Sequence, residues 1–143
     1  MVTLMLLPGM DGTGTLFEPF VAALGNEFNV NVVTYPTRKP LGYEALESIA
    51  RAALPSEGPI VILGESFSGP IAISLAASCS SRLKGLVLCC TFVLSPRPVF
   101  SALKSLVDVL PVALTPVRVL SHLLLGRFST PALRRSLKQA LAQ

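Results

Sequence analysis

The stretch LGESFSG contains a serine in a setting that suits nucleophilic chemistry. Ser66 follows a β-branched apolar run and precedes a helical pattern, so it is expected at a sharp strand-to-helix turn. Such a turn strains the backbone and pushes the hydroxyl out above the sheet. The positions two before and two after the serine must be small, and Gly64 and Ser68 satisfy this requirement. The pattern predicts an exposed nucleophile at residue 66.

The helix behind this turn is expected to assist the same chemistry. Gly69 completes the small-residue turn, and Pro70 suits a first helical turn, where a missing N–H costs nothing. A helix N-terminus also stabilises negative charge that develops nearby. The alternative interpretation is structural: small residues at this turn would only let a helix pack closely against a sheet.

A second motif, LLPGMDGTG, lies between the first expected strand and the first expected helix. The backbone N–H groups of Met10 and Phe67 could together hold the oxygen of a tetrahedral intermediate, an effect worth about 3–4 kcal/mol per donor. Asp11 is expected to shape the loop by bonding its own backbone rather than to take part in chemistry. The glycines match neither G-x-G-x-x-G nor a Walker loop, which argues against a nucleotide site.

The first two-thirds of the chain alternates strand-like and helix-like segments. This order predicts βαβ units and a parallel sheet. The expected strands are residues 2–7, 28–35, 59–63 and 83–94, and the expected helices are residues 16–25, 43–54 and 67–80. The last strand is a continuous apolar run, typical of a strand covered on both faces. Three further helices, with no strand between them, are expected at residues 98–110, 112–125 and 131–140.

The composition is unusually apolar for a domain that stands alone in water. Of 143 residues, 51% are hydrophobic and 14% are charged, and the mean hydropathy is +0.64. No apolar run approaches the ~18 residues of a membrane span, so none is expected. The N-terminus has no signal-peptide pattern, which predicts a cytoplasmic protein with reduced cysteines. Cys79, Cys89 and Cys90 fit no metal-ligand spacing, and Cys89 and Cys90 should point to opposite faces of a strand.

Charge is unevenly distributed along the chain. Residues 1–94 contain five Lys and Arg against seven Asp and Glu, whereas residues 95–143 contain seven basic residues and one acid, Asp108. A basic segment can indicate a nucleic-acid or anionic-lipid surface. Amphipathic helices with solvated basic faces are the preferred interpretation, because Phe100 and Phe128 form no stacking pattern.

At the PGMDG loop and the GESFSG turn the chain resembles the α/β-hydrolase superfamily. The opening LLPGMDGTGTLF is similar to small esterase-like and acyltransferase-like members that begin with LPG-x-DGTG. The resemblance implies a partial α/β-hydrolase fold with about four parallel strands and flanking helices over residues 1–94. It implies an all-helical, cap-like segment over residues 95–143. It also implies Ser66 as nucleophile and Met10 and Phe67 as oxyanion donors, with no cofactor and no metal.

The resemblance stops at the partners that a serine nucleophile needs. A histidine must take the serine proton, and an acid must orient that histidine; in this fold both follow later strands. His122 is the sole histidine, and it and Asp108 lie in apparent helices, a poor context for base and acid. The chain is therefore expected to be the front part of a hydrolase and weakly active alone. An open sheet edge at residues 86–94 should also make it self-associate.

Three classes of function remain open. The leading hypothesis is a serine hydrolase acting on an ester or thioester with an apolar acyl group; with an alcohol as acceptor, the same site is an acyltransferase. The tail residues expected to line an acyl pocket are Leu110, Leu114, Val119, Leu123 and Leu124. The alternatives are a non-catalytic binding or scaffold protein on the same fold, and a basic tail that docks on membranes or nucleic acid.

Overall fold

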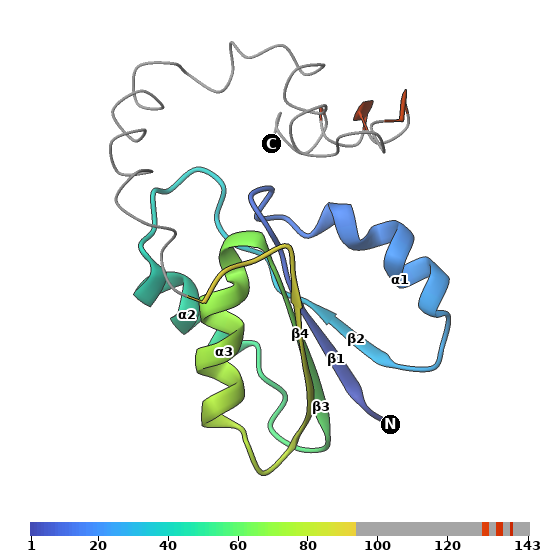
Figure 1. The fold of residues 1–143 in the computed structure, drawn as a ribbon, viewed down its shortest axis with the longest axis vertical. Coiled ribbons are helices and arrows are strands. Elements are labelled where there is room, and N and C mark those ends of the chain that lie inside the picture. Colours follow the sequence, from blue (N-terminus) through green and yellow to red (C-terminus); the bar gives the residue numbers. More distant parts are fainter. Residues whose placement is uncertain (94–129, 132–133, 136–137, 139–143) are drawn as a thin grey trace. The chain divides into compact units, whose positions relative to one another are not determined.

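A computed structural model describes residues 1–93, 130–131, 134–135 and 138 of the chain (Figure 1). The chain divides into two compact units, Met1–Leu94 and Ser95–Gln143. In the second unit the described residues after Thr130 are helical, and the Arg134 N–H donates to the Thr130 carbonyl over 3.0 Å. The tail helices expected at residues 98–110 and 112–125 lie outside the described residues.

The first unit is built on a sheet of four parallel strands. The strands are β1 (Thr3–Leu7), β2 (Asn29–Val32), β3 (Ile60–Glu65) and β4 (Leu83–Cys89). Their order across the sheet is β2-β1-β3-β4, and every neighbouring pair is parallel. The prediction of about four parallel strands is confirmed.

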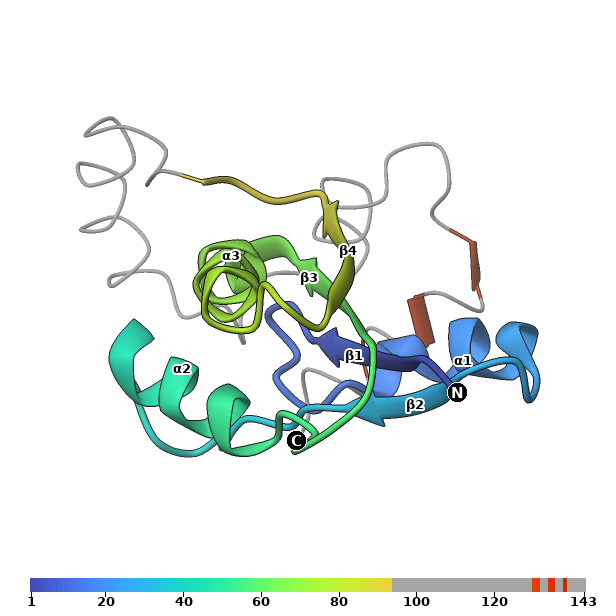
Figure 2. The same cartoon turned by 90° about the horizontal axis from the view of Figure 1, so that it is seen from below.

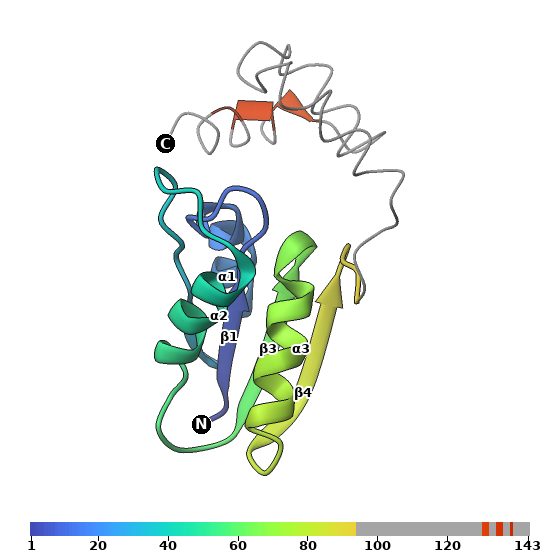
Figure 3. The same ribbon diagram turned by 90° about the vertical axis from the view of Figure 1, so that its left-hand side faces the viewer.

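Helices cover both faces of this sheet. Helix α1 (Glu18–Leu24) lies on one face, and α2 (Tyr43–Ala52) and α3 (Gly69–Ser78) lie on the other (Figures 2 and 3). Since successive strand residues point to opposite faces, β1 divides its side chains between two cores. Leu4 and Leu6 pack with Phe17 on the α1 side, whereas Met5 and Leu7 join the core on the other side.

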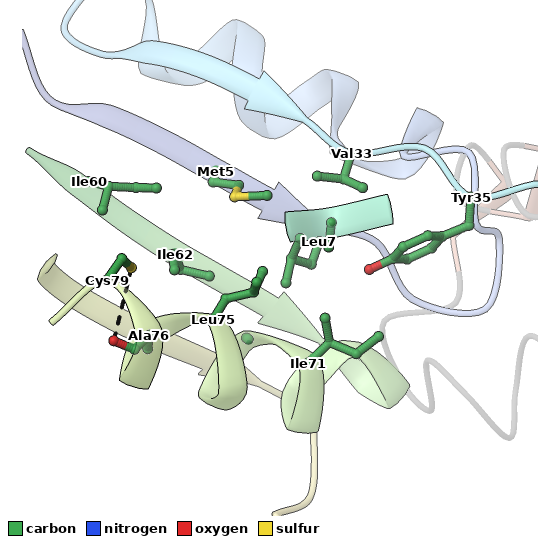
Figure 4. Close-up of a cluster of buried hydrophobic side chains, with 12 residues drawn as sticks. Met5, Leu7, Val33, Tyr35, Ile60, Ile62, Ile71, Leu75, Ala76 and Cys79 are labelled. Atoms are coloured by element: carbon green, nitrogen blue, oxygen red, sulfur yellow. Dashed lines mark hydrogen bonds between the residues drawn. The ribbon is translucent and has the colours of Figure 1, made fainter. Parts of the chain in front are cut away.

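The larger core fills the space between the sheet and helices α2 and α3 (Figure 4). Five residues of α3 are buried, which fits the apolar character of that helix on nearly every side. This core fixes α3, and therefore the turn that leads into it. Its buried members are Met5, Leu7, Val33, Tyr35, Ala50, Ile60, Ile62, Ile71, Ala72, Leu75, Ala76 and Cys79.

The strand ends differ from the sequence expectation in ways that the hydrogen bonds explain. β2 ends at Val32, because the Tyr35 N–H donates to the Gly12 carbonyl over 2.7 Å instead of continuing the ladder. β3 extends to Glu65, which pairs with Cys89 of β4.

The strand expected at residues 83–94 is shorter and less covered than predicted. β4 ends at Cys89, and Cys90 has a φ of 47°, so the two cysteines do not alternate along one strand. Val87 and Leu88 are 45% and 41% exposed. These consecutive residues point to opposite faces of the strand, so the expectation of cover on both faces is wrong within the described residues. There β4 pairs with β3 alone, as the edge strand that the sequence analysis expected.

Candidate functional site

Ser66 lies at the sharp turn that the sequence predicts. β3 ends at Glu65, a single 3-10 turn spans Ser66–Ser68, and α3 begins at Gly69. Ser66 has a φ of 52°, and of the other non-glycine residues described only Cys90 has a positive φ. A non-glycine residue in this region is strained and is held there by its surroundings. The described backbone therefore has the geometry of a nucleophile elbow.

Close packing explains the two glycines around the elbow. A Cβ on Gly64 would lie 2.6 Å from the Ala72 Cβ and 3.0 Å from the Ser68 carbonyl oxygen, so a side chain does not fit. A Cβ on Gly69 would overlap the side chain of Thr91. The Thr91 hydroxyl donates to the Ser66 carbonyl oxygen, which ties the segment after β4 to the elbow.

Ser68 does more than satisfy a size limit. Its side chain is fully buried, and its Oγ donates to the Pro8 carbonyl oxygen over 2.5 Å. The Tyr35 hydroxyl oxygen lies 3.5 Å from the same Oγ. Burial raises the pKa of Tyr35, and the Ser68 hydrogen bond acts in the opposite direction. The hydroxyl at position 68 thus joins the elbow to the loop after β1.

The loop after β1 lies directly beside Ser66. A Cβ on Gly9 would be 3.4 Å from the Ser66 Cβ. The Gly12 N–H donates to the Gly9 carbonyl over 3.0 Å, which closes a turn with Met10 and Asp11 at its corners. Met10 is 65% exposed. The structure therefore brings the PGMDG loop and the elbow together.

Asp11 shapes this loop, as expected. It is 7% exposed, and its Oδ2 accepts hydrogen bonds from the Gly14 N–H at 2.8 Å and the Thr13 hydroxyl at 2.9 Å. Gly14 must be a glycine because its φ is 76° and a Cβ there would overlap Val32. The loop is held by its own side chain and by the neighbouring strand.

Phe67, the other expected oxyanion donor, is fixed by two tyrosines. Its ring centroid is 5.9 Å from that of Tyr35 and 6.4 Å from that of Tyr43. Aromatic pairs at these distances stabilise a fixed arrangement. The rings anchor the 3-10 turn that contains the Phe67 backbone amide.

Glu65 is an acidic residue at the site that the sequence motifs do not single out. Burial raises the pKa of its carboxyl group, the nearby charge of Asp11 raises it further, and a hydrogen bond from the Gly9 N–H lowers it. The charge of Asp11 therefore acts on the carboxyl group that directly precedes Ser66.

Three contacts at the site carry weak sequence signals. Ser68 donates to Pro8, Thr91 donates to Ser66, and the Glu65 side chain packs against Gly9. Glu65 ends β3, Ser68 lies in the turn that follows, and Thr91 comes two residues after β4. Such placement marks a residue for inspection, but only coordinates reveal its partner 25 to 60 positions away.

The described residues contain the serine and the loop but neither His122 nor Asp108, which lie outside them. The five apolar tail residues expected to line an acyl pocket also lie outside. No group of three or more His, Cys, Asp or Glu side chains in the described part of the chain could hold a metal ion. Among the helices described, none has the length and apolarity needed to cross a bilayer.

Comparisons with known proteins agree with this fold. No family model matches the chain. The chain is 37% identical over 81 residues to phytyl ester synthase 1, chloroplastic, of Arabidopsis thaliana, a match that covers 52% of this chain and 12% of that protein. A solved structure described as a marine microorganism esterase superposes with a TM-score of 0.57 and 18% identity.

The structural match covers 96% of this chain and 58% of the esterase chain. The chain therefore spans about an eighth of the curated relative and somewhat more than half of the solved structure. This chain has a parallel sheet with helices on both faces, and the superposition shows that it shares this α/β fold with the esterase structure. The chain thus carries part of that fold.

Proposed function

We propose that Ser66 is the nucleophile of a serine hydrolase or acyltransferase that forms an acyl-enzyme. The observation that supports this most is the left-handed backbone of Ser66 beside the PGMDG loop, where a Cβ on Gly9 would lie 3.4 Å from the Ser66 Cβ. A strained backbone is retained where it serves a site. A small-residue turn needed only for packing has no reason to hold a serine at a φ of 52°.

In the proposed mechanism the Ser66 Oγ attacks the carbonyl carbon of an ester or thioester. The backbone N–H groups of Met10 and Phe67 receive the oxygen that becomes negative, and the alcohol or thiol leaves from an acyl-serine. Water or an alcohol then takes the acyl group. The proton from Ser66 passes to a base, which then returns it to the departing alcohol or thiol.

The test is labelling of the whole chain with a fluorophosphonate probe. Wild type should label at Ser66, Ser66→Ala should not, and Ser56→Ala, which removes an exposed serine hydroxyl, should label like wild type. Mass spectrometry identifies the modified residue. Wild type that labels no faster than Ser66→Ala contradicts an activated serine and favours the non-catalytic binding or scaffold protein.

An acyltransferase is a specific second candidate because the similar Arabidopsis protein is called an ester synthase. The same acyl-enzyme would then pass its acyl group to an alcohol. An activated long-chain acyl ester offered with a long-chain alcohol distinguishes the two outcomes. A new ester that appears faster than free acid indicates transfer; free acid alone indicates hydrolysis. An apolar acyl group remains a prediction, measured by comparing short and long acyl chains.

We further propose that the chain associates with itself through β4, which has exposed apolar side chains and no partner on its outer side within the described residues. A cytoplasmic location also stays a prediction. The word chloroplastic belongs to the name of the similar protein. A fluorescent fusion imaged in cells decides between the two compartments.

A further inference from the structure

Thr91 contacts the backbone of the elbow from a distant part of the sequence. It is half-buried two residues after β4, and its hydroxyl donates to the Ser66 carbonyl oxygen. β4 runs parallel to β3, and Cys89 at the end of β4 pairs with Glu65 at the end of β3. Since the carboxyl ends of parallel neighbours meet at one edge of a sheet, the residues after β4 emerge beside the elbow.

Close packing fixes the Thr91 side chain in addition to this hydrogen bond. A Cβ on Gly69 would lie 2.8 Å from both the Cβ and the Cγ2 of Thr91, closer than such atoms approach in proteins. Gly69 has a φ of −57°, an ordinary helical value. The glycine is therefore needed for space rather than for its conformational freedom, and Thr91 occupies that space.

The backbone is strained on both sides of the hydrogen bond. Ser66, which provides the carbonyl, has a φ of 52°, and Cys90, which directly precedes Thr91, has a φ of 47°. No other non-glycine residue among those described has a positive φ. Such angles persist where the surroundings impose them, and the turn at Cys90 carries the chain from β4 to the elbow.

The hydrogen bond acts on the peptide unit that contains the proposed Phe67 donor. The Ser66 carbonyl and the Phe67 N–H belong to one planar trans peptide bond and point in opposite directions across it. A donor that holds the oxygen therefore also sets the direction of the N–H. The Gly69 N–H donates to the same oxygen, so the peptide plane is held by two donors from different segments.

We propose that Thr91 is a positioning residue that directs the Phe67 N–H at the developing oxyanion. The inference rests on the proposed function, in which Ser66 is the nucleophile and Phe67 an oxyanion donor. Such a donor contributes most when it is oriented before the charge develops. Without the Thr91 hydroxyl, the Gly69 N–H alone holds the peptide, which can then tilt away from the reacting oxygen.

The first test measures the direction of the Phe67 N–H and needs no activity. Residual dipolar couplings of the whole chain in a weakly aligning medium report the direction of each N–H vector. Thr91→Val keeps the shape of the side chain and removes the hydroxyl, so the Phe67 coupling should change and the Ser66 carbonyl carbon resonance should move upfield. Thr91→Ala, which removes the hydroxyl and leaves more room beside Gly69, should give the same two changes.

Two further variants control this measurement. Thr91→Ser keeps the hydroxyl and should retain the wild-type coupling and resonance. Thr34→Val, at an exposed threonine, should also leave both unchanged. A Ser66 carbonyl resonance that stays in place without the Thr91 hydroxyl overturns the hydrogen bond, and an unchanged Phe67 coupling overturns the positioning role. Both results come from unreacted protein, so they separate this inference from the proposed function.

The rate at which the fluorophosphonate probe labels Ser66 gives the functional readout. Thr91→Val should label about tenfold more slowly, because a misdirected donor stabilises the oxygen less than an aligned one. Thr91→Ser should recover the wild-type rate. Equal rates for the valine and serine variants overturn the positioning role. Wild-type protein that does not label at Ser66 would instead count against the proposed function, while the couplings still decide whether Thr91 orients the Phe67 N–H.

Discussion

The hydroxyl of Ser68 stabilises the site through a single buried hydrogen bond to Pro8. Ser68→Ala should lower the free energy of unfolding by about 1–3 kcal/mol, because the buried Pro8 carbonyl loses its donor. Urea denaturation measures the change, with Ser56→Ala at an exposed position as the control. Ser68→Gly introduces the residue that the G-x-S-x-G motif usually has, yet this variant should be no more stable than Ser68→Ala, because it also lacks the hydroxyl. A glycine variant as stable as wild type contradicts this role for the hydroxyl.

The raised pKa of Glu65 should make the free energy of unfolding fall as pH rises. Its pKa in the folded state is raised above the ordinary 4.5, so folding favours the protonated form. The contribution of the protonated Glu65 side chain to the free energy of unfolding is complete below pH 4.5, and it declines as pH rises through the folded-state pKa. Glu65→Gln should therefore gain stability relative to wild type as pH rises from 4.5 through the raised pKa of Glu65. The measurement is urea denaturation of both proteins at each pH, and a constant difference across the range rules the effect out.

Among the elements, β4 is the one whose exposed face should govern association. Leu88→Lys places a charge on that exposed surface, a common protection against edge pairing. We expect self-association to weaken about tenfold, since burying a leucine is worth roughly 1.5–3 kcal/mol. Sedimentation equilibrium measures the effect. Phe20→Lys is a matched control, because Phe20 is 40% exposed but lies on helix α1. Equal association of wild type and Leu88→Lys would exclude β4 as the interface.

The element order could be predicted from the sequence because short apolar runs alternate with helical spacing and end at clear stop signals. Gly25 ends α1 with a φ of 60°, and Pro70 lies in the first turn of α3, both as expected. The ends of β2 and β4 could not be predicted. Tyr35 leaves the strand pattern for a hydrogen bond to Gly12, a contact between segments far apart in the chain. Local patterns carry no information on such partners.

For the candidate site, too, the local turn could be predicted from the sequence, whereas contacts between different loops could not. Spacing alone located the elbow at Ser66 and its steric limit at Gly64, since both are backbone requirements of one turn. The contacts of Glu65 with Gly9 and of Thr91 with Ser66 join different loops of the fold. They depend on how strands are ordered in the sheet, which residue types do not encode individually.

At the scale of the whole molecule, the charge is divided between the two units. Residues 1–94 carry a net −2 and residues 95–143 a net +6. We predict no DNA binding tighter than about 10⁻⁴ M at about 0.15 M salt, because the basic residues are interspersed with apolar ones and lack stacking aromatics. Fluorescence anisotropy with a short duplex is the assay. Arg135→Gln with Lys138→Gln, both exposed, should leave the signal unchanged. Micromolar binding that these changes abolish would establish the basic tail as a nucleic-acid surface.

The position of β1 between β2 and β3 has a consequence for the order in which the protein can form on the ribosome. β1 is synthesised before either neighbour, so it has no sheet partner until β2 emerges and no second partner until β3 does. The Pro8 carbonyl and the Ser68 hydroxyl that joins it are 60 positions apart. The nascent loop therefore lacks its hydrogen bond to the turn after β3 until three of the four strands have been synthesised, and this interval is when the growing chain is most exposed to chaperones and to misfolding.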